Sequence, residues 1–225
     1  MTRKSYPTDL TDAQWQAIEP HFNQLRHYKW DKRQLVNAVL YMTKTGCQWR
    51  MLPNDFPPYS TVWSFYRRAN QSGLWDRILL ALVQIQKKRL IHQKLAMPTY
   101  AIIDSQSVKT ASSAHDKGFD GGKKIKGRKR HIAVDTLGNL LSVVVHAANI
   151  HDTKAGIFVA KKAFETYPSL KGFCADAGYR NTFEREVSEQ LGLTVEISKK
   201  IQDISWHILP KRWIVERTFA WLGWS

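Results

Sequence analysis

Cysteine is scarce in this chain of 225 residues, and long hydrophobic runs do not occur in it. The two cysteines, Cys47 and Cys174, sit among apolar or aromatic neighbours, so we expect buried free thiols rather than a disulfide. Cysteine and histidine do not recur at the spacing of a zinc site. No apolar run is long enough to span a membrane, and the N-terminal residues lack the apolar core of a signal peptide. These absences predict a cytoplasmic protein.

Acidic residues are few relative to basic ones. The chain carries 34 lysines and arginines against 19 aspartates and glutamates, which gives a net charge of +15 at pH 7. Such an excess favours a polyanion as partner, and nucleic acid is the obvious candidate. The hydrophobic share of 43% is typical of a globular protein, and the length allows one large domain or two small ones.

Residues 1–95 show helical patterns. Thr11, Asp31 and Ser60 stand where N-caps are expected, and apolar residues follow each of them at helical spacing. Short helices around a proline-rich turn predict a helix-turn-helix-like DNA-binding domain, in which Arg67 and Arg68 contact phosphates. The same pattern also fits a small helical domain whose arginines are simply solvated.

A carboxylate follows a short apolar run after Pro98. Tyr100, Ile102 and Ile103 predict a buried strand that ends on Asp104. An acid at that place is costly to bury unless it is hydrogen-bonded, paired or bound to a cation, which makes it a candidate catalytic group. Alternatively, Asp104 caps a turn formed by residues 105–107.

Two later acids occupy comparable places. Asp176 ends the apolar run 172–175 and precedes a glycine-containing exit, and Glu216 lies in a predicted helix over residues 210–222. Three isolated acids on three elements could converge on divalent cations. Mg²⁺ prefers such hard oxygen ligands, and two ions can promote phosphoryl transfer.

A basic run lies between the strand of Asp104 and a predicted hairpin. Residues 131–136 and 140–145 are expected to pair across a turn at 137–139, with Asp135 as a turn residue, and Asp152 is expected to cap the next helix. The basic run is either solvated surface or a clamp for the phosphate backbone, and we favour the clamp. Its members are Lys123, Lys124, Lys126, Arg128, Lys129 and Arg130.

Four segments carry a resemblance to a known family. They are residues 103–109 (Ile-Asp-Ser-Gln-Ser-Val-Lys), the glycine- and lysine-rich segment 118–138, residues 175–179 (Ala-Asp-Ala-Gly-Tyr) and residues 213–222 (Trp-Ile-Val-Glu-Arg-Thr-Phe-Ala-Trp-Leu). In this order they resemble the transposases of bacterial insertion sequences, closest to the family-five group of the DDE superfamily. The resemblance covers nearly the whole chain.

This resemblance implies an α/β fold, in which a small all-α domain (1–95) precedes a ribonuclease-H-like catalytic domain (96–225) with a mixed sheet. The order strand, hairpin strands, helix, strand, helix, helix agrees with such a core. The implied activity is DNA transposition, with metal-dependent cleavage at the element ends and strand transfer to target DNA.

The resemblance also implies the residues and partners of that activity. Asp104, Asp176 and Glu216 would hold two Mg²⁺ ions, for which Mn²⁺ can substitute. The partner would be double-stranded DNA, at terminal inverted repeats and at the target, bound by a homodimer in the nucleoid. The expected DNA contacts are Lys109, Arg212, the two arginines at 67 and 68, and the basic run.

The end of the chain departs from the family pattern. Arg212 matches the arginine four residues before the glutamate, but Leu209 stands at the tyrosine position and Gly223 at the position of a downstream lysine. The chain stops at Ser225, so we expect a truncated copy. An active transposase, a non-catalytic DNA-binding protein or inhibitor, and a general nuclease of this fold all remain open.

Overall fold

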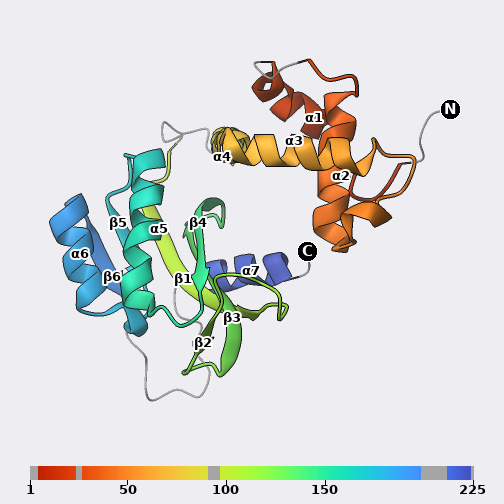
Figure 1. Ribbon diagram of the computed structural model, residues 1–225. Coiled ribbons are helices and arrows are strands. Elements are labelled where there is room, and N and C mark those ends of the chain that lie inside the picture. The colour runs from red at the N-terminus through yellow and green to blue at the C-terminus, as the bar shows by residue number, and fades with distance from the viewer. Residues whose placement is uncertain (1–4, 24–26, 91–96, 199–211, 224–225) are drawn as a thin grey trace. The chain divides into compact units, whose positions relative to one another are not determined.

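The computed structural model describes residues 5–23, 27–90, 97–198 and 212–223 (Figure 1). Contacts divide the chain into two compact units, residues 1–85 and 86–224. The division falls within a helix, earlier than the expected boundary at residue 95. The two units are described separately below.

The first unit is helical, and several of its caps agree with the sequence. Its elements are α1 (Asp12–Ile18), the 3₁₀ turns η1 (Glu19–Phe22) and η2 (Trp49–Met51), α2 (Lys32–Thr45), α3 (Tyr59–Gln71) and the start of α4 (Leu74–Leu90). Thr11 forms a capping box with Gln14, and Asp31 caps α2. Ser60 is not the cap that we expected: α3 begins one residue earlier, and the Pro58 carbonyl accepts the first amides.

The core of the first unit lies between α2 and α3. Leu35 and Val39 from α2 meet Val62 and Phe65 from α3, and all four are buried. Aromatic rings fill the remaining space, with Phe65 stacked on Phe22 at 6.4 Å between ring centroids. One face of α3 is therefore fixed inward, and its opposite face is presented to solvent.

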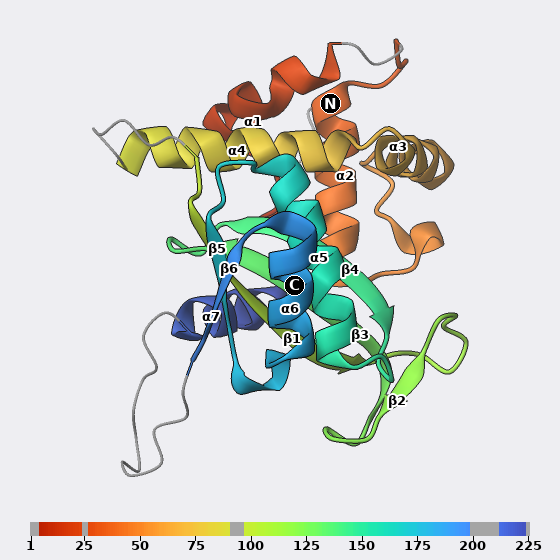
Figure 2. The ribbon, with the colours of Figure 1, turned by 90° about the vertical axis from the view of Figure 1, so that its left-hand side faces the viewer.

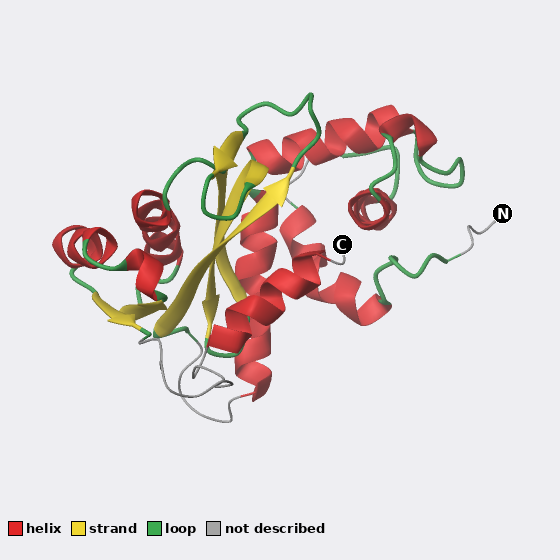
Figure 3. Cartoon of the chain, turned by 90° about the horizontal axis from the view of Figure 1, so that it is seen from below, coloured by secondary structure: helices red, strands yellow, loops and turns green. Residues whose placement is uncertain are grey.

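The second unit is built on a six-stranded sheet (Figure 3). Its strands are β1 (Tyr100–Lys109), β2 (Gly118–Asp120), β3 (Ile125–Asp135), β4 (Leu140–Ala147), β5 (Gly172–Ala175) and β6 (Thr194–Ile197). β1 is central, antiparallel to β3 and parallel to β5, which in turn is parallel to β6. β2 and β4 pair with successive parts of the other edge of β3. The order β4-β3-β1-β5-β6 is the ribonuclease-H-like arrangement, as expected.

Helices cover both faces of this sheet (Figure 1). On one face lie α5 (Asp152–Thr166) and α6 (Thr182–Leu191), seen in front of the strands in Figure 2. On the other face, α7 (Arg212–Gly223) buries Ile214, Val215 and Phe219 against Ile102 of β1 and Ile132 of β3. Alternate residues of each strand therefore face two different environments.

The strands extend further than their apolar residues indicated. β1 does not end on Asp104 but continues to Lys109, so residues 105–107 are strand rather than turn. The basic run is likewise no loop between strands, because β3 begins at Ile125 and contains most of it. Backbone pairing of β1 with β3 over nine residue pairs, from Ala101↔Asp135 to Lys109↔Gly127, compensates for weak local preference.

Two turn residues illustrate where local reasoning succeeds and fails. Asp135 holds the β3–β4 hairpin, as predicted, because its Oδ1 accepts the amides of Leu137 and Asn139 at 2.9 Å each. Asp152, however, is not the cap of α5. His151 takes that place, and the carboxylate of Asp152 is directed to a buried lysine instead.

Among the described residues, none of the helices combines the length and hydropathy needed to cross a bilayer.

Candidate active site

Asp104 lies in β1, and Asp176 directly follows the neighbouring parallel strand β5 at the matching position. Ile102 of β1 is paired with Cys174 of β5, and each aspartate follows its paired residue by two positions. The backbone at Asp176 is still extended, with φ −82° and ψ 176°, so the two chains run side by side up to that point. Ile102 and Cys174 both pack in the cluster that contains α7. By strand alternation, Asp104 and Asp176 face the same side.

The chain turns sharply just after Asp176. This residue is the N-cap of the 3₁₀ turn η3 (Ala177–Tyr179), and its Oδ1 accepts the Gly178 amide at 2.8 Å. Tyr179 then anchors the turn: it is fully buried, and its ring lies edge-on to Phe183 at 5.3 Å between centroids. The turn that follows Asp176 is thus held from both ends.

The ring of Tyr179 also reports on the charges around it. Burial raises the pKa of Tyr179 well above its ordinary value, and the negative charges of Asp152, Asp104 and Asp176 raise it further. The phenol of Tyr179 is therefore neutral at ordinary pH.

The third candidate acid, Glu216, lies on α7. Its neighbours Ile214 and Val215 are buried against the sheet, whereas Glu216 itself is exposed beside that apolar face. The helix thus lies over the same face of the sheet as the two aspartates, with Glu216 at its margin. Across the described residues, no group of three or more histidine, cysteine, aspartate or glutamate side chains forms a metal-binding cluster.

Two arginines fasten α7 to the sheet. Arg130 of β3 donates through Nε and Nη2 to Gln106 Oε1 of β1, and its Nη1 donates to the Leu222 carbonyl of α7 at 3.4 Å. Arg217 of α7 donates to the Leu137 carbonyl of the hairpin at 3.1 Å. Its guanidinium is also stacked between Trp213 and Trp221, 4.7 and 4.8 Å from their ring centres.

The opposite face of the sheet holds a buried ionic network. Lys129 is 5% exposed, and its Nζ lies 2.8 Å from Asp152 Oδ1 and 3.4 Å from Asp120 Oδ2. Asp120 also accepts the Ser107 hydroxyl at 2.6 Å. That hydrogen bond, with help from the Lys123 amide and Lys129, lowers the pKa of Asp120 to about 2 against the effect of burial. The network joins β1, β2, β3 and the start of α5.

A buried histidine pair extends this network. His131 Nδ1 and His146 Nε2 are 2.8 Å apart, and His146 Nδ1 lies 2.8 Å from the Ala147 carbonyl. Since a carbonyl only accepts, we assign the His146 proton to Nδ1, and His131 then donates to His146. Burial lowers the pKa of His131 to about 3, an effect that the charge of Asp152 only partly offsets.

The structure separates the predicted DNA contacts into different environments. Lys109, Lys123, Lys124 and Lys126 are exposed. Arg128 is half-buried and donates to the His115 carbonyl at 2.6 Å, which leaves it at the surface. In the first unit, Arg67 is exposed beside Trp63, and Arg68 is half-buried beside Tyr28. The side chain of Arg212, like Leu209, lies outside the described residues.

Several members of the basic run have partners within the protein, and one expectation needs correction. Lys123 Nζ donates to the Ser105 carbonyl at 3.2 Å, in addition to the contact of Arg128 described above. Lys129 is buried and neutralised by two aspartates, so it is not placed to contact phosphate. It faces the α5 side of the sheet because strand alternation directs it away from Arg128 and Arg130. Arg130 uses its guanidinium to bind Gln106 and the Leu222 carbonyl of α7. Burial lowers the pKa of Arg130.

The sequence does not reveal the buried polar residues on the α5 face of the sheet, opposite to the face of the candidate acids. Asp120, His131 and Tyr179 belong to no local pattern that marks them as buried and polar. One signal was available: the apolar residues 132–134 continue the strand of Lys129, a lysine buried in such a strand has to be neutralised, and Asp152 follows at the start of a helix. The pairing itself joins residues 23 positions apart.

The strand order β4-β3-β1-β5-β6, with helices on both faces, defines a ribonuclease-H-like domain with Asp104 in its central strand and Asp176 directly after β5. Residues 96–223 match the family described as "Transposase DDE domain", and residues 10–79 match the family described as "Putative transposase of IS4/5 family". The chain belongs to the family of DDE-domain transposases.

A curated relative supports this assignment. The chain is 27% identical over 107 residues to the "Putative transposase for insertion sequence element IS402" of Burkholderia cepacia. The match covers 43% of this chain and 49% of the relative, so the chain spans about half the length of that protein.

Proposed function

We propose that this chain catalyses DNA transposition of an insertion sequence, by cleavage at the element ends and strand transfer to target DNA. The observation that carries the proposal is the register of β1 and β5. Asp104 and Asp176 each follow the pair Ile102↔Cys174 by two residues, on the face of the sheet that α7 covers. This register supports the two aspartates as the proposed catalytic acids, and the family assignment supplies the reaction class.

The donor set fits a hard divalent cation. Carboxylate oxygens are preferred ligands of Mg²⁺, and Mn²⁺ accepts the same donors. Asp104 and Asp176 would hold the ions, with Glu216 as the third carboxylate. When bound, two such ions stabilise the attacking and leaving oxygens of a displacement at phosphorus. The hydrogen bond from the Gly178 amide and the buried ring of Tyr179 fix the turn that follows Asp176.

The proposed partner is double-stranded DNA, at terminal inverted repeats and at the target site. Exposed cations at Lys109, Lys123, Lys124 and Lys126, with Arg128 beside them, provide attraction for the phosphate backbone. A chain that acts on two element ends is expected to work as a homodimer on DNA, in the nucleoid.

Cleavage of duplexes that carry the element ends tests the proposal. We expect Mg²⁺-dependent cutting by the wild-type chain and a loss of at least about 10²-fold in Asp104→Asn and Asp176→Asn. Both variants should still bind duplex DNA, because neither aspartate contributes to phosphate attraction. Glu189→Gln, which changes an exposed carboxylate on α6, is the matched control and should cleave normally.

A second readout separates metal binding from activity. Mg²⁺ should raise the melting temperature of the wild-type chain, because a ligand of the folded state stabilises it, and this increase should vanish in Asp104→Asn. Undiminished cleavage in both aspartate variants would contradict the assignment of the acids. DNA binding without any cleavage by the wild-type chain would reduce the proposal to a DNA-binding protein.

A further inference from the structure

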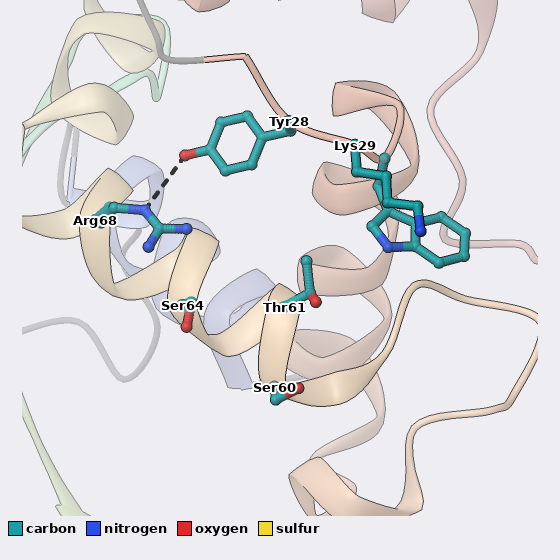
Figure 4. Close-up of a pocket in the computed structure, with 7 residues that line it drawn as sticks. Tyr28, Lys29, Ser60, Thr61, Ser64 and Arg68 are labelled. Atoms are coloured by element: carbon teal, nitrogen blue, oxygen red, sulfur yellow. Dashed lines mark hydrogen bonds between the residues drawn. The ribbon is translucent and has the colours of Figure 1, made fainter.

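The first unit has a hollow between α3 and residues 28–30 (Figure 4). Its volume is about 400 Å³, and it opens onto the surface, since Lys29, Trp30 and Ser60 are exposed. Small-molecule sites normally bury most of their ligand's surface. An open hollow of this kind is better suited to one group of a polymer that passes over it.

The α3 side of the hollow is a row of polar side chains. Ser60, Ser64 and Arg68 are spaced by four residues, so they lie along one stripe of the helix, and Thr61 stands beside the first (Figure 4). The inner stripe of α3, with Val62, is buried in the core of the unit. Core packing therefore fixes the hydroxyl row toward the hollow.

Two cations flank the hydroxyls. Arg68 is oriented by Tyr28, whose hydroxyl accepts its Nε at 3.4 Å and whose ring centre lies 5.5 Å from the guanidinium carbon (Figure 4). Lys29 is on the opposite wall. Hydroxyls and fixed guanidinium donors, with an ammonium nearby, are the groups that proteins use to contact backbone phosphates.

A second hollow next to this one has a less favourable lining for an anion. It lies against the same segment, shares Tyr28 and Trp30, and has a volume of about 290 Å³. Its lining includes the carboxylates of Glu19 and Asp31, which repel a phosphate. The lining of the α3 hollow contains no acidic side chain. Charge therefore favours the α3 hollow.

We propose that the hollow between α3 and residues 28–30 binds a backbone phosphate of duplex DNA and so seats the first unit on its substrate. The proposal rests on the proposed function, since it assumes DNA as the partner. It identifies Lys29, Ser60, Thr61, Ser64 and Arg68 as phosphate contacts. Arg67, one residue along α3, belongs to a different stripe beside Trp63.

Salt-dependent binding of a fluorescein-labelled DNA duplex by the full chain tests the site. Lys29→Ala and Arg68→Ala should each lower the magnitude of the slope of log affinity against log salt, measured between about 50 and 200 mM NaCl, and the double variant should lower it by about 0.9, the share of one phosphate. Ser64→Ala should weaken binding by about threefold to tenfold without changing the slope, because it removes a hydrogen bond but no charge. Thr61→Glu should weaken binding more than Ser64→Ala, because it adds a negative charge.

A cation outside the hollow provides the matched control. Arg50→Ala removes an exposed cation from η2 in the same unit and should retain more of the wild-type affinity than Lys29→Ala. Arg68→Ala also breaks a contact with Tyr28, so the melting temperature of each variant is measured. If Arg68→Ala proves unstable, the binding data for Lys29→Ala and Ser64→Ala decide whether the hollow contacts phosphate. Wild-type affinity and slope in those two variants would overturn the site and leave the proposed function intact.

Two other outcomes bear on the partner. A wild-type chain that binds no duplex at any salt concentration would overturn both the site and the proposed function. If Lys29→Ala and Ser64→Ala weaken the binding of single-stranded DNA but not of duplex DNA, the assignment of duplex DNA to this hollow is wrong.

Discussion

Lys129 Nζ lies 2.8 Å from Asp152 Oδ1, on the face of the sheet that is turned away from Asp104. The same ammonium lies 3.4 Å from Asp120, which is bound to Ser107 of β1. Burial alone would raise the pKa of Asp152, but the hydrogen bond and the charge of Lys129 outweigh that effect and lower it. The sequence predicts Lys129 as part of a basic clamp for DNA, but in the fold it connects β3 to β1, through Asp120 and Ser107, on the α5 face of the sheet.

Lys129→Ala should destabilise the fold rather than weaken DNA binding directly. It leaves two aspartates facing each other in a poorly solvated place, and breaking such a buried pair typically costs about 3–5 kcal/mol. Urea denaturation measures the change. Lys126→Ala, which removes an exposed lysine from the same strand, should leave the free energy of unfolding nearly unchanged. Equal stability of the two variants would contradict the ionic role of Lys129.

His131 should make the fold sensitive to acid. Its pKa is about 3 in the folded chain and near 6.5 when unfolded, so between these values the unfolded chain binds a proton that the folded chain excludes. Stability should therefore decrease as the pH falls below about 6.5, by up to about 1.4 kcal/mol per pH unit from this residue. His131→Gln should remove that contribution in urea titrations between pH 4 and 7, and His115→Gln, on the surface, should retain it.

Arg130→Ala should loosen α7. The arginine joins Gln106 of β1 to the Leu222 carbonyl, and its loss should cost about 1–3 kcal/mol and speed amide exchange in α7. Cleavage should fall more than DNA affinity, because Glu216 lies on that helix. Arg130→Lys serves as the discriminating variant. A phosphate contact would be rescued by lysine, whereas the forked bonds to Gln106 would not.

Lys124→Ala and Lys126→Ala should each reduce the salt slope of duplex binding by about 0.9, because both side chains are exposed. The measurement is fluorescence anisotropy on a DNA duplex at several salt concentrations. Melting temperatures should stay close to the wild-type value. An unchanged slope in the double variant would rule out Lys124 and Lys126 as phosphate contacts.

Local signals were sufficient where a short stretch of sequence decides the structure. The capping box of Thr11 and Gln14 and the hairpin around Gly138 both follow from neighbouring residues. The end of β1 does not. Residues 105–109 have little strand preference of their own, and their pairing with β3 cannot be inferred from their own sequence.

The candidate site was predictable in part for the same reason. Asp176 is marked locally by its apolar strand and its glycine-containing exit. The neighbourhood of Asp104 and Asp176, by contrast, depends on a parallel pairing between segments about 70 residues apart. Asp152 was assigned a capping role because its real partner, Lys129, lies on a different element.

Gly127 interrupts the basic run at the point where three strands meet. It is paired with Lys109 of β1 and Gly118 of β2, and its carbonyl accepts the Ala148 amide at 3.1 Å. A Cβ atom at this place would collide with the Val108 carbonyl oxygen. Strand pairing at Gly127 therefore fixes the positions of the lysines and arginines on either side of it, unlike the positions of charges in an unstructured tail. An insertion at residue 127 would shift the register of every later residue of β3 against β1, and any side chain there would force the two strands apart at this point.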